Sequence, residues 1–78
     1  MTRYQNTSRD SGVVAYQIEA DRILVQFASG DIYAYTYKKP GKVMVEQMKE
    51  LARQGRGLST FISKAVRGRY ERKLQERT

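Results

Sequence analysis

The 78-residue chain contains neither cysteine nor histidine. Without cysteine there is no disulfide framework, and without both residues there is no zinc site of the Cys/His type. The commonest general bases and activated nucleophiles are missing as well, because most of them use histidine or cysteine. No apolar run approaches the roughly 20 residues that span a bilayer. We therefore expect a protein that is not an enzyme, with no metal, no cofactor and no membrane segment.

The first twelve residues lack the apolar region of a secretory signal peptide, so the cytoplasm is the expected location. They are polar and end in Asp10-Ser11-Gly12, which predicts a flexible leader over residues 1–12. The length allows one domain, which we place at residues 13–70. Residues 71–78 then form a basic C-terminal extension.

Acidic residues are scarce in the last third. Residues 1–52 hold seven Lys or Arg against six Asp or Glu, whereas residues 53–78 hold eight against two. Such asymmetry indicates an anionic partner, with nucleic acid first (RNA before DNA) and an acidic protein second. The alternative is a solvated surface that keeps a small protein soluble.

Two stretches, Val13–Glu19 and Ile23–Phe27, alternate bulky apolar residues with smaller or polar ones and so predict β-strands. A two-residue connection at Ala20-Asp21 sets their apolar residues on one face. The resulting pairs are Val14–Phe27, Tyr16–Val25 and Ile18–Ile23, with Glu19 opposite Arg22.

The turn at Ser29-Gly30 admits two registers for a third strand. A type I turn with Gly30 in a G1 bulge places Tyr33 and Tyr35 on the core face, opposite Val25 and Ile23. A two-residue loop would need positive φ at Ser29, which serine tolerates poorly. We therefore expect the bulged register.

The unbulged register would place the tyrosines on the open face, where they could stack bases. In the bulged register Tyr33 and Tyr35 pack under a helix instead. Tyr37, beside Lys38 and Lys39 at the strand end, is then the ring expected to be exposed.

Pro40 suits the first turn of a helix over residues 41–54, and Gly55 suits its left-handed stop. Glu46–Lys49 and Glu50–Arg53 are i,i+3 ion pairs on this helix. Ser59 is the expected N-cap of a second helix. Tyr70 and Leu74 continue its apolar spacing, so the helix either breaks at Gly68 or runs on through the C-terminal extension.

The predicted fold class is α+β, a three-stranded antiparallel meander with two C-terminal helices packed on one face. The apolar positions of these elements predict the core, which comprises Val14, Tyr16, Ile18, Ile23, Val25, Phe27, Tyr33, Tyr35, Met44, Met48, Leu51, Phe61, Ile62 and Val66.

The order of these features resembles the KTSC family, a short domain named for its place at the C-terminus of some lysyl-tRNA synthetases. The resemblance covers about residues 8–70. Tyr33-Ala34-Tyr35 matches the family's Y-x-Y, and Phe61 with Arg67-Gly68-Arg69-Tyr70 matches its last element. Relatives often have asparagine after that phenylalanine, where this chain has Ile62. The resemblance implies the fold, with RNA binding as a suggested activity.

The residues expected to bind nucleic acid are cations that can contact phosphates and two rings that can stack on bases. They are Tyr37, Lys38, Lys39, Arg53, Arg56, Lys64, Arg67, Arg69, Tyr70, Arg72 and Lys73. The alternative is exposed charge, relieved on a helix by Arg67–Glu71 and Arg72–Glu76 pairs. Gly55-Arg56-Gly57 before a helix could also cradle an anion, although a plain turn is the simpler interpretation.

The sequence thus predicts a small non-enzymatic module that binds nucleic acid, RNA first, through its basic last third. The alternative is a protein–protein interaction module, such as a phage or plasmid accessory protein that docks on an acidic partner. Its contact would be an edge strand or the open sheet face, formed by Ala15, Gln17, Leu24, Gln26, Ile32 and Ala34.

Overall fold

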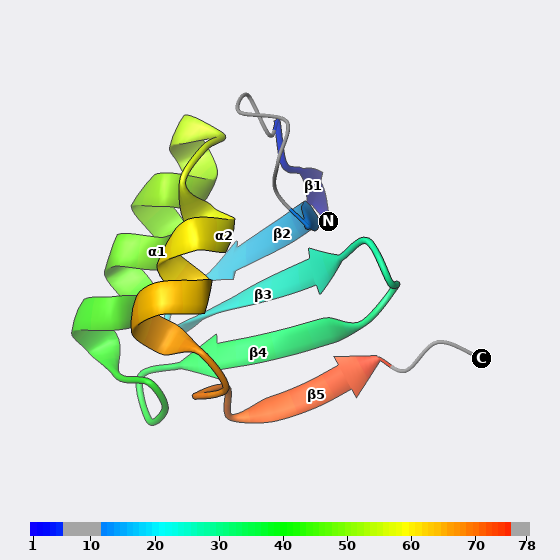
Figure 1. Ribbon diagram of the computed structural model, residues 1–78. Coiled ribbons are helices and arrows are strands. Elements are labelled where there is room, and N and C mark those ends of the chain that lie inside the picture. Colours follow the sequence, from blue (N-terminus) through cyan, green and yellow to red (C-terminus); the bar gives the residue numbers. More distant parts are fainter. Residues whose placement is uncertain (6–11, 76–78) are drawn as a thin grey trace.

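A five-stranded antiparallel sheet with its strands in sequence order forms the centre of the protein (Figure 1). The computed structural model describes residues 1–5 and 12–75. The strands are β1 (Thr2–Arg3), β2 (Val13–Glu19), β3 (Arg22–Phe27), β4 (Ile32–Thr36) and β5 (Arg72–Gln75). The α+β class is as predicted, but the three-stranded meander is wrong. Strands β2 to β4 form that meander, and β1 and β5 extend it at both edges.

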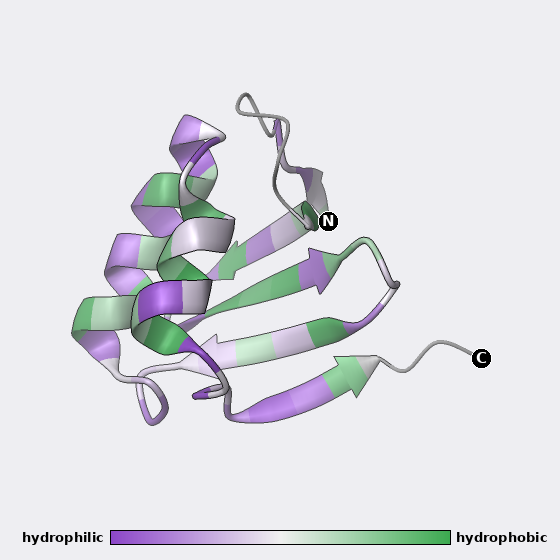
Figure 2. Cartoon of the chain, viewed as in Figure 1, coloured by the Kyte–Doolittle hydropathy of each residue, from purple (hydrophilic) through white to green (hydrophobic). Residues whose placement is uncertain are grey.

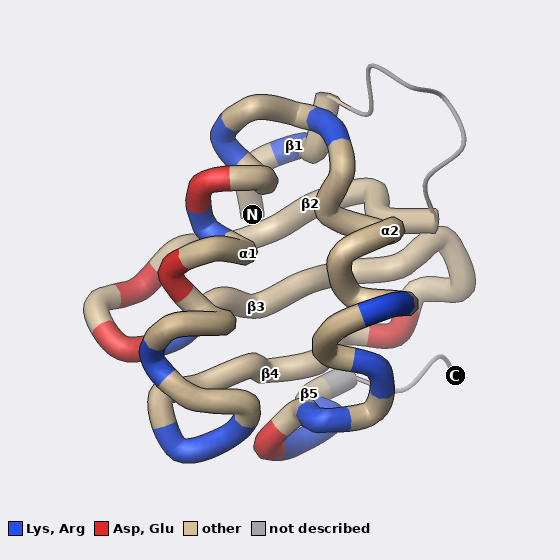
Figure 3. The backbone as a smooth tube through the Cα atoms, turned by 60° about the vertical axis from the view of Figure 1, so that its left-hand side comes forward, with Lys and Arg blue, Asp and Glu red and all other residues tan. Residues whose placement is uncertain are grey.

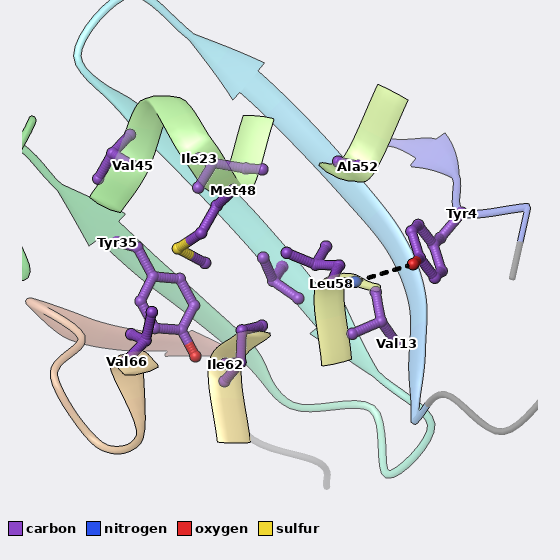
Figure 4. Close-up of a cluster of buried hydrophobic side chains, with 11 residues drawn as sticks. Tyr4, Val13, Ile23, Tyr35, Val45, Met48, Ala52, Leu58, Ile62 and Val66 are labelled. Carbon is purple, nitrogen blue, oxygen red and sulfur yellow. Dashed lines mark hydrogen bonds between the residues drawn. The ribbon is translucent and has the colours of Figure 1, made fainter. Parts of the chain in front are cut away.

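Strand β1 lies in the stretch predicted to be a flexible leader. Its two residues are too few to show a period in sequence, and a buried ring anchors them. Tyr4 is only 3% exposed, and its hydroxyl accepts a hydrogen bond from the Leu58 N–H at 3.2 Å (Figure 4). Residues 1–5 therefore belong to the folded domain. The rest of the predicted leader, residues 6–11, lies outside the described residues.

Strand β5 replaces the helical continuation that the spacing of Tyr70 and Leu74 allowed. The helix ends at Val66, and the Glu71 N–H donates to the Ala34 carbonyl at 2.8 Å. Pairing with β4 satisfies backbone groups along an otherwise open sheet edge, whereas a longer helix would have to include Gly68. Both flanks of the predicted domain thus contribute strands.

The first hairpin keeps most of its predicted register. Ile18 pairs with Ile23 and Tyr16 with Val25, and Glu19 lies opposite Arg22. The predicted Val14–Phe27 pair is wrong, because a bulge between Val13 and Ala15 sets Val13 opposite Phe27 instead. Val13 is therefore buried, at 1% exposure, while Val14 is 42% exposed.

The second hairpin has the bulged register. Gly30 has φ of 98°, and its N–H donates to the Phe27 carbonyl at 2.8 Å, as a type I turn followed by a G1 bulge requires. Tyr33 pairs with Val25 and Tyr35 with Ile23. Both rings consequently lie on the helix side of the sheet.

The helices cover one face of the sheet (Figure 1). Helix α1 spans Lys42–Gln54 and ends at Gly55, whose φ of 76° is the predicted left-handed stop. Helix α2 (Leu58–Phe61) continues into a π-helical turn, η1 (Ile62–Val66). The predicted Ser59 N-cap is wrong, since the cap is Gly57, where the hydroxyl of Tyr4 satisfies the first helical amide.

Apolar and polar residues alternate along the helices (Figure 2), and the buried apolar ones, among them Val45, Met48 and Leu58, belong to the core. Several predicted core residues, including Phe27, Tyr33, Leu51 and Phe61, are only partly buried and pack around the core. The buried cluster itself comprises Tyr4, Val13, Ile23, Val25, Tyr35, Val45, Met48, Ala52, Leu58, Ile62 and Val66 (Figure 4).

Candidate functional site

The cations predicted to bind nucleic acid fall into separate groups (Figure 3). One group follows η1, the turn after it and β5; we call it the C-terminal basic surface and define it as Lys64, Arg67, Arg69 and Lys73. Arg72 pairs with Ala34, whereas Lys73 pairs with Tyr33, so Arg72 lies on the opposite face of the sheet from Lys73. Lys38 and Lys39 lie in the loop between β4 and α1. Arg53 and Arg56 lie at the far end of α1 and in the loop that follows it, near the N-terminus. The structure therefore does not bring all the predicted residues together.

A tight turn organises the C-terminal basic surface. The Arg69 N–H donates to the Val66 carbonyl at 3.0 Å, and the Arg67 N–H donates to the Ile62 carbonyl. Arg67 has φ of 53° and ψ of −126°, the first central position of a type II′ turn, where glycine is the usual residue. The turn reverses the chain so that β5 can pair with β4. A non-glycine residue in such a conformation costs about 1–3 kcal/mol.

Three cations of this surface have no carboxylate partner among the described residues. Lys64, Arg67 and Arg69 are exposed, and no ion pair joins them to an acid within residues 1–5 and 12–75. The predicted Arg67–Glu71 pair requires a helix, which the turn removes. The acid predicted to pair with Arg72 lies outside the described residues. Among the described residues, the exposed positive charge of this region is thus largely uncompensated.

Lys73 differs from the other members because it lies close to both an acid and a ring. Its ammonium is 3.5 Å from the Asp31 carboxylate and 5.8 Å from the centroid of the Tyr33 ring. It is the member of the C-terminal basic surface that is tied most closely to the sheet.

Tyr70 packs on the two tyrosines of the Y-x-Y stretch. Its ring centroid is 4.5 Å from that of Tyr33 and 6.3 Å from that of Tyr35, the latter in an edge-on arrangement. Phe27 lies edge-on to Tyr33 at 5.6 Å. Burial is the main reason that the pKa of Tyr35 lies above its ordinary value of 10.0. Tyr35 is therefore a core residue, whereas Phe27, Tyr33 and Tyr70 remain partly exposed.

Tyr37 is not the freely exposed ring that the sequence predicted. Its hydroxyl donates to the Glu46 carboxylate at 2.6 Å, and the Lys49 ammonium lies 2.8 Å from the same oxygen. Lys42 and Lys49 lie 5.9 and 5.6 Å from the centroid of its ring. These contacts join the end of β4 to α1.

The contacts around Tyr37 also shift two pKa values. The hydrogen bond to Glu46 raises the pKa of the Tyr37 hydroxyl. Hydrogen bonds from Lys49 and then Tyr37 lower the pKa of the Glu46 carboxyl. Lys49 itself is 4% exposed, and its ammonium also donates to the Ala20 carbonyl at 3.1 Å. Sequence spacing found the Glu46–Lys49 pair, but nothing in the pattern indicated that the lysine is buried.

Two of the amides that an anion cradle at Gly55-Arg56-Gly57 could use already have partners. The Gly55 N–H donates to the carbonyls of Leu51 and Ala52, and the hydroxyl of Tyr4 accepts a hydrogen bond from the Leu58 N–H. The glycines therefore end one helix and begin the next, which is the simpler of the two interpretations of the sequence.

A small cavity of about 140 Å³ lies beside the C-terminal end of β4. Its charged lining is balanced, with two acids and two bases, and Arg22 already contacts Asp21 at 3.2 Å. This ion pair lowers the pKa of Asp21. The cavity is lined by Asp21, Arg22, Thr36, Tyr37, Lys38 and Glu71.

Across residues 1–5 and 12–75, no three acidic side chains gather closely enough to hold a metal ion. In the same ranges no helix has the length and apolar character to cross a bilayer. No protein-family model, characterised protein or solved structure matches the chain. The resemblance to KTSC domains therefore stays a prediction.

Proposed function

We propose that this protein is a small non-enzymatic nucleic-acid-binding module, with RNA as the first candidate ligand. The observation that carries the proposal is the C-terminal basic surface, where Lys64, Arg67 and Arg69 are exposed without a carboxylate partner among the described residues. Unpaired cations on a folded surface release counterions from a phosphate backbone when they bind it. RNA comes first because the motif order resembles KTSC domains.

The position of the surface also supports the proposal. Its members come from a short helical turn, a tight turn and an edge strand, so their backbones are fixed by the fold. Lys38 and Lys39 add exposed cations from the loop that follows β4. A backbone held in place loses less conformational entropy when a ligand binds.

The test is the salt dependence of binding to a fluorescently labelled RNA, measured by anisotropy. We expect the double variant Lys64→Gln, Arg69→Gln to weaken binding about tenfold at low salt and to reduce the salt slope by about 2. Both positions avoid the unusual backbone of Arg67, so the change removes charge without altering the turn.

The matched control is Arg53→Gln, Arg56→Gln, which removes the same charge from the other end of the molecule. It should change affinity and slope far less. Equal effects of the two double variants would mean that net charge alone drives association. Absence of RNA binding at low salt would refute the proposal.

A second candidate is a protein-interaction module, favoured by the sheet face that no helix covers. The bulged register puts the half-buried side chains of Leu24 and Ile32 on this face, beside Gln26. Ala15 and Ala34 lie on the same face, and a contiguous apolar patch left open to solvent marks a contact surface. A partner captured after nuclease treatment and lost on Leu24→Lys, in a protein that does not bind RNA, would favour this function.

A further inference from the structure

Three aromatic rings form a continuous strip at the β5 side of the sheet. Phe27 ends β3, Tyr33 lies in β4, and Tyr70 lies just before β5. The ring centroids of Phe27 and Tyr33 are 5.6 Å apart, and those of Tyr33 and Tyr70 are 4.5 Å apart. We call these three residues the aromatic strip.

Phe27 and Tyr33 are partly exposed toward the end of the sheet that the helices do not cover, and Tyr70 is partly exposed between η1 and β5 (Figure 1). The β3–β4 hairpin extends beyond α1 and α2 toward the Gly30 turn (Figure 1). Tyr35, one pleat further along β4, is 2% exposed and lies under the helices. The same face of one strand thus carries a core tyrosine and then a tyrosine of the strip.

Cations border the strip. Lys73 lies 5.8 Å from the Tyr33 ring centroid, and the turn that carries Arg67 and Arg69 leads directly into Tyr70. Side chains that can contact phosphates therefore stand next to rings that can contact bases, within one short segment of chain.

Duplex and single strand would use these two features differently. In a duplex the base faces are covered by stacking on one another, so the rings cannot stack on a base and the cations would supply the main contacts. In a single strand the base faces are free, and stacking on an aromatic side chain contributes in proportion to the bases engaged. A purely electrostatic surface needs no rings beside its cations.

We propose that the ligand of the C-terminal basic surface is a single-stranded nucleic acid with an unpaired base stacked on the aromatic strip, at Tyr70. This inference rests on the proposed function. The phosphates on either side of that base contact Lys64, Arg67 and Arg69. Tyr33 and Tyr35 support the Tyr70 ring from beneath, which fixes its plane before the ligand arrives.

The test compares three labelled ligands of equal length by fluorescence anisotropy. They are an oligouridine single strand, the same strand as a duplex, and an oligomer with abasic sites that keeps the phosphates. We expect the single strand to bind about 5- to 150-fold more tightly than the abasic oligomer, the range that one stacked base provides. This comparison uses the unaltered chain, so it does not depend on how a variant folds.

A pair of variants then assigns the stacking to one ring. Tyr70→Leu keeps an apolar side chain against Tyr33 but removes the ring, and it should abolish the preference for the single strand. Tyr70→Phe keeps the ring and should retain that preference. Thermal unfolding followed by circular dichroism checks that both variants are folded.

Two results would overturn the inference in distinguishable ways. Equal affinity for single strand, duplex and abasic oligomer would leave the proposed function intact and show that only phosphates are recognised. No binding to any of the three would refute the proposed function and this inference together.

Discussion

Lysines and arginines serve different purposes at two regions of this molecule. Around α1 and the β2–β3 turn they are paired, with Lys49 at 2.8 Å from Glu46 and Arg22 at 3.2 Å from Asp21. On the C-terminal basic surface, Lys64 and Arg69 have no acidic partner among the residues that the structure describes. The number of charged residues along the chain does not distinguish the paired cations from the unpaired ones.

The two regions differ in packing as well as in charge. Lys49 is buried and joins the helix to the sheet through the Ala20 carbonyl, so its charge is part of the fold. Lys64 projects from a short turn into solvent, so its charge is available to a ligand. Removing a paired basic residue at a buried junction therefore affects stability, whereas the exposed basic residues without an acidic partner are the candidates for binding.

The largest difference in stability that we expect between the two regions comes from replacing one glycine in each. Gly55 has φ of 76°, and a Cβ placed there would lie 2.8 Å from the Gln5 Cβ. Gly55→Ala should therefore lower the free energy of unfolding by about 3 kcal/mol, from backbone strain and overpacking together. Gly68, between Arg67 and Arg69, has nothing within 4 Å of such a Cβ. Gly68→Ala should change that free energy by less than about 0.5 kcal/mol.

Urea unfolding followed by circular dichroism measures both glycine variants. Similar losses at the two positions would contradict the difference in packing between the regions. A small loss at Gly55 alone would show that the segment around Gln5 moves aside easily.

The next difference concerns the buried and exposed lysines. Lys49→Ala removes a charge-assisted hydrogen bond to Glu46 and one to Ala20, and it should cost about 2 kcal/mol of unfolding free energy. Lys64→Ala should cost less than about 0.5 kcal/mol and should weaken RNA binding instead. If Lys49→Ala leaves the free energy of unfolding unchanged, the Lys49 charge contributes no more to stability than the exposed charge of Lys64. The two variants need only an unfolding titration and a binding titration each.

Local chemistry in the sequence predicted the centre of the sheet. The register of the second hairpin followed from one fact, that serine tolerates positive φ poorly and glycine does not. Gly55 as the helix stop followed from the same conformational freedom. These features depend only on residues close together in the chain, so a local sequence pattern is enough to predict them.

The edges of the sheet and the buried polar contacts depend on distant residues. Tyr4 is buried because it meets Leu58, 54 positions away, and no local pattern contains that contact. Strand β5 forms because β4 offers an open edge, while the apolar spacing around Tyr70 suits a helix equally well. The bulge at Val14 reverses one position of an otherwise regular alternation. For the same reason the sequence predicted the Glu46–Lys49 pair but not the burial of Lys49.

A smaller effect concerns the backbone of the basic surface. Arg67 has φ of 53°, so Arg67→Gly should relieve strain and raise the free energy of unfolding by about 1 kcal/mol. Arg69→Gly, outside the positive-φ region, should bring no such gain. Arg67→Gly should nevertheless weaken RNA binding, because it removes one of the exposed cations. A variant that loses stability would show that the Arg67 side chain supports the fold after all.

The smallest effect that we expect is on the acid limb of the stability profile, which is the fall of the free energy of unfolding at acidic pH. Hydrogen bonds from Lys49 and then Tyr37 lower the pKa of Glu46 below its ordinary value of 4.5 in the folded protein. A carboxyl with a lowered folded-state pKa stabilises the fold above its unfolded pKa, and this contribution is lost as the pH falls through the folded-state pKa.

Glu46→Gln should therefore leave a shallower fall of unfolding free energy below pH 4.5, while part of the slope remains because Arg22 lowers the pKa of Asp21. Glu50→Gln is the control, since Glu50 lies one turn along α1 and makes only exposed contacts, at 3.8 Å with Arg53 and 3.4 Å with Gln54. Urea titrations at a series of acidic pH values measure both slopes. If the two variants flatten the acid limb equally, the Tyr37–Glu46–Lys49 contacts contribute no more than an ordinary surface pair, and the paired region would differ from the basic surface in packing alone.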